Sequence, residues 1–275
     1  MIRVALVQMD STDDIEQNLM KVIKYVKQAA QGGAALVAFP EFMNFLPFRR
    51  GHIYYESEHG RTEQLLIRLA REYHLAIHAG SVLIDSGLPR PYNQAFLVDP
   101  EGGISGRYSK LHLFRGMSPS GETFREDELY SPGNEIVVTS ILGIPAGTAI
   151  CYDFRFPELF RLMARAGAQI IFVPGNFSMH TGRYYLEAAL KTRAMENGVF
   201  IVSANQTGVK KKAESFGHSM IIDPSGQVVA VKETGEGVLF YDLDPQVVPR
   251  QQRLLPLLDT ARDEVYDDFR SRLKK

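Results

Sequence analysis

Three polar side chains whose types together could carry out acyl transfer each stand at or just past the end of a predicted strand. Glu41 follows the run ALVAFP, Lys110 follows ISGRYS, and Cys151, the only cysteine in the chain, follows GTAI. Strand ends and their loops are where helix-covered sheets usually place catalytic groups. Taken singly, these residues also fit an acid at a helix end, a surface lysine and a small core residue. Taken together, they form a set that could do chemistry.

The chemistry follows from what a thiol needs. A cysteine thiol has a free pKa of about 8.5 and attacks a carbonyl only as the thiolate. A carboxylate such as Glu41 could accept its proton. An ammonium such as Lys110 favours the thiolate and could stabilise the oxyanion that forms, with the backbone N–H of Tyr152 as a second donor. These residues could therefore transfer an acyl group without a histidine.

Composition narrows the class of protein. The chain has 275 residues, of which 45% are hydrophobic and 23% charged, with a net charge of −1. We expect one globular, soluble domain over residues 1–275 that binds neither nucleic acid nor a membrane. Its single cysteine excludes an internal disulfide and fits the reducing cytoplasm. The sequence has no HExxH motif or paired cysteines, so we expect no metal and no cofactor.

Strand and helix patterns alternate along the chain, which predicts an α/β fold. Helices are expected over 14–31, with Asp13 as cap, and over 61–74, 157–166 and 183–197; strands are expected over 2–8, 35–40, 75–84, 147–151, 169–174 and 199–205.

Two stretches, AFLVDPEGGISGRYSK and SMIIDPSGQVVAVK, both read as hairpins with Asp-Pro-x-Gly turns, at Asp99 and Asp223. They indicate two similar halves packed together, each containing a sheet.

Three motifs in order identify a family. PEF (40–42), KLHLF (110–114) and ICYDFRFPE (150–158) resemble the nitrilase superfamily of carbon–nitrogen hydrolases, and the resemblance extends over nearly the whole chain. It implies a four-layer αββα sandwich that dimerises to αββα–αββα, with the tail at about 245–275 near the subunit interface. The apolar stretch 156–163 is then expected to form part of a homodimer contact.

The resemblance also implies catalytic roles. Glu41 would be the general base, Lys110 would stabilise the tetrahedral intermediate, and Cys151 would form a thioester. A second glutamate that orders the site corresponds to Glu126, in the sequence TFRE.

Further residues are expected to line the substrate pocket. Asn176 and Phe177 follow a predicted strand, and Tyr184 and Tyr185 stand where omega-amidase-like members usually carry His-Trp. Arg183 precedes that tyrosine pair. We expect at least one loop arginine to bind a substrate carboxylate, the candidates being Arg49, Arg50, Arg115 and Arg183.

Several functions remain compatible with these residues. The leading hypothesis is an amidohydrolase that releases ammonia or an amine from a small molecule. The alternative is an N-carbamoyl hydrolase with the same four residues, and acyl transfer to an amine is also open. A true nitrilase is disfavoured because Tyr152-Asp153 stands where Trp-Glu is usual. A scaffold without turnover is disfavoured because all four catalytic positions are filled.

Overall fold

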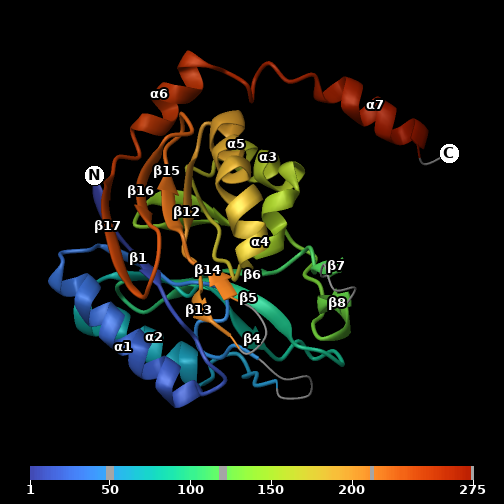
Figure 1. Ribbon diagram of the computed structural model, residues 1–275. Helices are drawn as coiled ribbons and strands as arrows, with labels where there is room; N and C mark the ends of the chain where they lie inside the picture. Colours follow the sequence, from blue (N-terminus) through green and yellow to red (C-terminus); the bar gives the residue numbers. More distant parts are fainter. Residues whose placement is uncertain (48–52, 118–122, 211–213, 274–275) are drawn as a thin grey trace.

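The computed structural model describes residues 1–47, 53–117, 123–210 and 214–273, which adopt a mixed α/β fold (Figure 1). Within these ranges the first sheet holds, in spatial order, β17 (Gly237–Leu243), β1 (Ile2–Gln8), β2 (Leu36–Ala38), β3 (Ala76–His78), β5 (Tyr92–Val98) and β4 (Val82–Ile84), with β6 (Ile104–Ser109) paired to β5. The second sheet holds β16 (Val228–Lys232), β15 (Ser219–Ile222), β12 (Phe200–Ser203), β11 (Ile170–Phe172), β10 (Ile144–Thr148) and β9 (Val138–Ile141).

The two sheets face each other across an apolar core. Leu6 and Leu36 from the first sheet join Phe172, Val202 and Ile221 from the second in one buried cluster. The strands β1, β2 and β3 are parallel and fully buried at their centres, as expected for strands covered on both faces. This inner core fixes the two halves of the molecule relative to each other.

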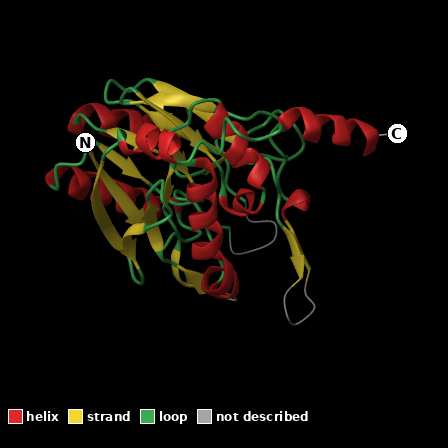
Figure 2. Cartoon of the chain, turned by 90° about the horizontal axis from the view of Figure 1, so that it is seen from above, coloured by secondary structure: helices red, strands yellow, loops and turns green. Residues whose placement is uncertain are grey.

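Helices cover the outer faces of both sheets (Figure 2). The helices α1 (Ile15–Gln31) and α2 (Arg61–Tyr73) pack on the first sheet through residues such as Val26 and Leu66. The helices α3 (Pro157–Arg165) and α5 (Glu187–Asn197) pack on the second through Phe160 and Leu190. None of the helices within the described residues has the length and apolar character needed to cross a membrane.

The remaining elements lie outside this core. Two short ribbons pair β7 (Arg115–Met117) with β8 (Thr123–Arg125) and β13 (Thr207–Val209) with β14 (Glu214–Phe216). The helices α6 (Val247–Leu254) and α7 (Asp263–Leu273) follow β17, and α7 projects away from the rest of the chain (Figure 1). No residue of α7 is buried.

Some sequence predictions need correction. The cap of α1 is Asp14, whose carboxylate accepts the Gln17 N–H at 3.1 Å, and not Asp13. The expected strand over 75–84 is two strands, β3 and β4, separated at Gly80, which has φ +64°. A Cβ on Gly80 would come within 2.0 Å of the Pro40 carbonyl oxygen. Because Gly80 has no Cβ, the loop that carries Glu41 can pack against the segment between β3 and β4.

Two further predicted elements have different boundaries in the structure. The strand before Cys151 ends at Thr148, and Cys151 instead begins a short 3-10 turn, Cys151–Arg155. The expected helix over 183–197 begins as a π-helical turn, Gly182–Leu186, preceded by the short α4 (Met179–Thr181).

The hairpin predictions are confirmed, with the Gly102 and Gly226 N–H groups each bonding the aspartate carbonyl of their turn at 2.9 Å.

The stretch 156–163 uses most of its apolar surface inside the molecule. Leu159, Phe160 and Met163 are buried against the second sheet, whereas Leu162 is 50% exposed. The abundance of apolar residues in this stretch therefore reflects packing of α3 on its own sheet, and Leu162 alone offers a large exposed apolar side chain there.

Candidate active site

A buried lysine joins the two glutamates that the sequence singled out. The Lys110 Nζ lies 3.0 Å from Oε1 of Glu41 and 2.9 Å from Oε2 of Glu126. Lys110 is 0% exposed, and both carboxylates are buried. A buried charge is strongly disfavoured unless it is paired, so this ammonium is held between its two carboxylates.

Each member of this cluster is positioned by a different element. Glu41 follows β2, and the loop behind it is fixed by Ser81, whose hydroxyl accepts the Phe42 N–H at 3.1 Å. Lys110 follows β6 directly. Glu126 begins the 3-10 turn Glu126–Glu128, and its Oε2 accepts the Phe114 N–H at 2.7 Å. Residues far apart in the sequence therefore meet because strand ends and turns converge.

Cys151 comes to the same place from the second sheet. It lies in the turn after β10, where its N–H donates to the Pro174 carbonyl at 2.8 Å. Its thiol lies 4.0 Å from the carbonyl oxygen of Asn176, whose own N–H donates to Oε2 of Glu41 at 2.9 Å. Asn176 therefore links the nucleophile candidate to the base candidate.

The electrostatics favour a neutral thiol beside a carboxylate. Burial raises the pKa of the Cys151 thiol well above its ordinary value, and the Glu41 charge raises it further, although Lys110 opposes the rise. Burial likewise raises the pKa of the Glu41 carboxyl, with Lys110 again opposing. Burial alone would lower the pKa of Lys110, but Glu126 and Glu41 raise it well above its ordinary value. Lys110 is therefore an ammonium, and Glu41 has a raised affinity for a proton.

The turn at Cys151 also presents a free backbone donor. The N–H of Tyr152 has no backbone acceptor within the described part of the chain, as expected for the first turn of a short helix. Asp153, one residue on, is fully buried and accepts hydrogen bonds from the Tyr108 hydroxyl at 2.7 Å and the Ile150 N–H at 2.8 Å. Asp153 thus fixes the turn that aims the Tyr152 N–H.

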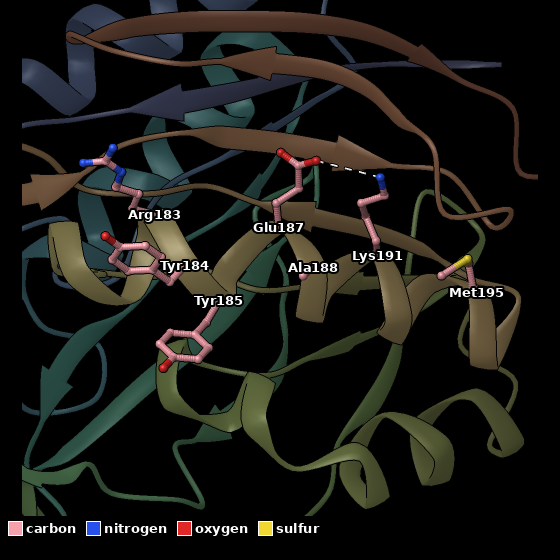
Figure 3. Close-up of a pocket in the computed structure, with 7 residues that line it drawn as sticks. All are labelled: Arg183, Tyr184, Tyr185, Glu187, Ala188, Lys191 and Met195. Atoms are coloured by element: carbon pink, nitrogen blue, oxygen red, sulfur yellow. Dashed lines mark ion pairs between the residues drawn. The ribbon is translucent and has the colours of Figure 1, made fainter.

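The structure does not bring the other expected pocket residues to this cluster. Phe177 is 3% exposed and packs edge-on against Phe154, with ring centroids 5.4 Å apart. Arg183, Tyr184 and Tyr185 are exposed and line a surface hollow of about 460 Å³ (Figure 3), whose lining includes no member of the buried cluster. Tyr185 points away from the side of the helix that carries Glu187 (Figure 3) and lies under the Arg155 guanidinium, 5.1 Å from ring centroid to Cζ.

Two of the candidate carboxylate-binding arginines are described and two are not. Arg115 forms an exposed ion pair with Asp127 at 2.9 Å. Arg183 lies over the Tyr184 ring at 5.8 Å. Arg49 and Arg50 lie outside the described residues.

Sequence reasoning missed several neighbours of the cluster. The Asn93 side chain donates to Oε1 of Glu41 at 2.9 Å, and the Gln206 side chain donates to the Glu41 carbonyl at 2.8 Å. Tyr130 is 3% exposed, and burial together with the nearby glutamate charges raises the pKa of its hydroxyl. The only sequence signal for Asn93 was the polar pair Asn93-Gln94 near the start of a strand that ends in the apolar run AFLV.

Comparisons with known proteins place this cluster in a family. The model of the carbon–nitrogen hydrolase family matches residues 3–252, and the chain belongs to that family. It is a hydrolase that acts on C–N bonds other than peptide bonds in small molecules, that is, an amidohydrolase.

Individual relatives agree over nearly the full length. The chain is 33% identical over 268 residues to "Omega-amidase NIT2-B" of Xenopus laevis, covering 96% of each chain. It is 31% identical over 278 residues to "Hydrolase C26A3.11" of Schizosaccharomyces pombe, covering 99% of this chain and 86% of that one. The crystal structure of Nit3 from Saccharomyces cerevisiae, a member of the nitrilase superfamily, is 28% identical with a TM-score of 0.84, covering 95% and 96%.

Proposed function

We propose that the chain hydrolyses a small-molecule amide through a thioester on Cys151. The observation that carries the proposal is the fully buried Lys110 ammonium, which the carboxylates of Glu41 and Glu126 hold beside the only cysteine. A surface lysine would need no such pairing. A permanently charged donor in a dry site is what a developing oxyanion requires.

The proposed steps use the residues of the buried cluster. Glu41 takes the thiol proton as Sγ of Cys151 attacks the amide carbonyl, and the carbonyl oxygen becomes an oxyanion. Lys110 and the Tyr152 N–H stabilise that oxyanion. The intermediate collapses, Glu41 returns the proton to nitrogen, and ammonia or an amine leaves. Glu41 then takes a proton from the water that attacks the thioester, and it passes this proton to the Cys151 thiolate as the carboxylic acid leaves.

Glu126 orients the lysine in this scheme. Its Oε1 and Oε2 both lie about as close to Nζ as Glu41 does, at 3.0 and 2.9 Å, and its Oε2 is fixed by the Phe114 N–H. With Glu126 present, Lys110 stays charged and in place while Glu41 gains and loses a proton.

The names of the relatives support a substrate class. Several carry the name omega-amidase, which favours an amide over an N-carbamoyl substrate. We propose the monoamide of a short dicarboxylic acid. The Tyr184-Tyr185 pair in place of His-Trp implies a different shape at the pocket entrance, with Asn176, Phe177 and Arg183 as further pocket candidates.

We also propose for this chain the layered architecture and the dimer that the resemblance to the family implies. Two facing sheets with helices on both outer faces support a four-layer αββα sandwich formed by one domain over residues 1–275. The exposed apolar side chains of α7, among them Tyr266 and Phe269, support a homodimer whose interface includes the tail at about 245–275. A thiol that must stay reduced supports a location in the cytoplasm.

One experiment tests the central proposal. Purified protein is incubated with monoamides of short dicarboxylic acids, with simple aliphatic amides and with N-carbamoyl acids, while ammonia and carbon dioxide release are measured. Intact-mass spectrometry of the rapidly quenched reaction should show one acyl group per chain. Release of carbon dioxide with ammonia from N-carbamoyl acids alone would replace the amide assignment with the carbamoyl one. No release from any of them would contradict the proposal.

A further inference from the structure

Asn93 touches both the base and the lysine of the proposed reaction. It lies on β5 and is 0% exposed. Its side-chain Nδ2 donates to Oε1 of Glu41 at 2.9 Å, and its backbone carbonyl accepts the Lys110 N–H at 2.9 Å. One residue therefore fixes the side chain of Glu41 and the backbone of Lys110.

The hydrogen bonds of the Glu41 carboxylate leave one oxygen for the thiol. Oε1 accepts from both Asn93 and Lys110, which fills the two lone-pair positions of a carboxylate oxygen. Oε2 accepts the Asn176 N–H, and the carbonyl oxygen of that same residue lies 4.0 Å from the thiol. The Glu41 carboxylate also forms a side-chain hydrogen bond with Cys151. Because both lone-pair positions of Oε1 are filled, the oxygen that retains a lone pair for the Cys151 thiol is Oε2.

The orientation of the Asn93 amide comes at a cost. Its Oδ1 is buried and has no hydrogen-bond partner within the described part of the chain. The flipped amide would place Oδ1 against Oε1 of Glu41, so that two acceptors face each other, which is unfavourable. An unpaired buried acceptor is destabilising, and an apolar side chain of similar size would avoid it. Packing alone does not explain an asparagine here, whereas a donor for Glu41 does.

We propose that Asn93 is a positioning residue that holds the Glu41 carboxylate charged and directs the proton from Cys151 onto Oε2. In this step the Sγ–H bond breaks, the Oε2–H bond forms, and the thiolate keeps the electron pair. The inference rests on the proposed role of Glu41 as base, and it assigns that role to one oxygen of the carboxylate.

The test uses the single cysteine as a reporter. The rate of alkylation of Cys151 by iodoacetamide is measured against pH by intact mass, where one adduct identifies the site because no other cysteine exists. The variants are Asn93→Leu, which keeps the branching at Cγ and removes the donor, and Asn93→Ala, which cannot clash. The matched control is Gln94→Ala, on the same strand, because the Gln94 amide bonds Ser109 and Arg107 and no member of the cluster.

A hydrogen bond to a carboxylate favours its charged form, so loss of the Asn93 donor raises the pKa of Glu41. The acid limb of the alkylation profile, where the rate falls as the pH decreases, should therefore shift to higher pH by about one unit in both Asn93 variants. At a pH below this limb, the shift makes alkylation of the Asn93 variants roughly tenfold slower than alkylation of the wild type. The Gln94→Ala profile should keep its limb.

Two results separate this inference from the proposed function. Alkylation of the thiol displaces iodide and cleaves no C–N bond, so a wild type that hydrolyses no amide would refute the proposed function and still leave the Asn93 test readable. A folded Asn93 variant that alkylates more slowly at every pH, with an unmoved acid limb and a lowered Tm, would overturn the inference and leave Asn93 as a packing residue.

Discussion

The buried cluster around Lys110 and the exposed segment around Tyr184 differ in burial and in how firmly their side chains are held. Lys110, Glu41 and Glu126 are almost fully buried, and each has partners at 3.0 Å or less. Tyr184 and Tyr185 are 62% and 48% exposed, on a π-helical turn at the surface. A buried charge tolerates one arrangement of partners, whereas an exposed side chain tolerates many. Burial therefore fixes the cluster that would carry out the proposed reaction, whereas the exposed segment, a candidate for substrate binding, is free to vary.

The largest expected effect is on the nucleophile. Cys151→Ala removes the thiol and keeps the Cβ, so the fold should be retained while amide turnover falls on the order of 10⁴-fold or more. Steady-state ammonia release and a thermal melt measure the two quantities. A variant that keeps a tenth of the wild-type kcat would show that no thioester forms on Cys151.

The next effect tests the charge inside the cluster. Lys110→Arg keeps the positive charge, but a planar guanidinium cannot occupy the place of a compact ammonium between Glu41 and Glu126. We expect kcat to fall about a hundredfold or more, as when an oxyanion donor is lost. Lys191→Arg, at the surface hollow, is the matched control and should leave kcat unchanged. Equal kcat values for the two variants would contradict the comparison.

A smaller effect is expected for the carboxylate that orients the lysine. Glu126→Gln keeps the size of the side chain and one oxygen for the Phe114 N–H, but it removes one of the two charges that hold Lys110. We expect kcat to fall about tenfold, the lower end of the effect of residues that orient a reacting group. The measurement is kcat at saturating substrate, and an unchanged value would place Glu126 outside the reaction.

The smallest effect is expected at the exposed segment. Arg183→Ala should raise KM for the monoamide of a dicarboxylic acid about threefold to tenfold and leave kcat within about twofold, because one exposed ion pair contributes little. The neutral amide of equal length is the control substrate, and its KM should not change. If both substrates respond alike, Arg183 does not bind the carboxylate, and the exposed segment affects turnover in some other way.

The sequence could predict the cluster because its members carry local signals. Glu41, Lys110 and Cys151 each follow a predicted strand, and Glu126 stands in a recognisable motif. Asn93 carries no such signal, since its contact with Glu41 joins residues 52 positions apart. That contact depends on how β2 and β5 are arranged in the sheet, which local patterns do not specify.

The errors in the predicted fold also arise where local sequence patterns do not specify the backbone geometry or the packing. Asp13 and Asp14 are equally good helix caps by type, and only the backbone geometry selects Asp14. The apolar run over 75–84 hid a break at Gly80, where glycine is required because the Pro40 backbone comes so close. In α3, periodicity identifies an apolar face but does not say whether a sheet of the same chain or a second subunit covers it.

The backbone of Cys151 has a consequence for how the enzyme would lose activity on heating. Its φ is +48°, a left-handed conformation that costs a residue with a Cβ on the order of 1–3 kcal/mol. The turn is held in that conformation by the bonds from the Cys151 N–H to Pro174 and from the Ile150 N–H to Asp153. When these bonds loosen, the turn can relax and move the thiol away from Glu41 while both sheets remain intact. Thermal inactivation would then begin at a lower temperature than unfolding, and cooling would restore the activity.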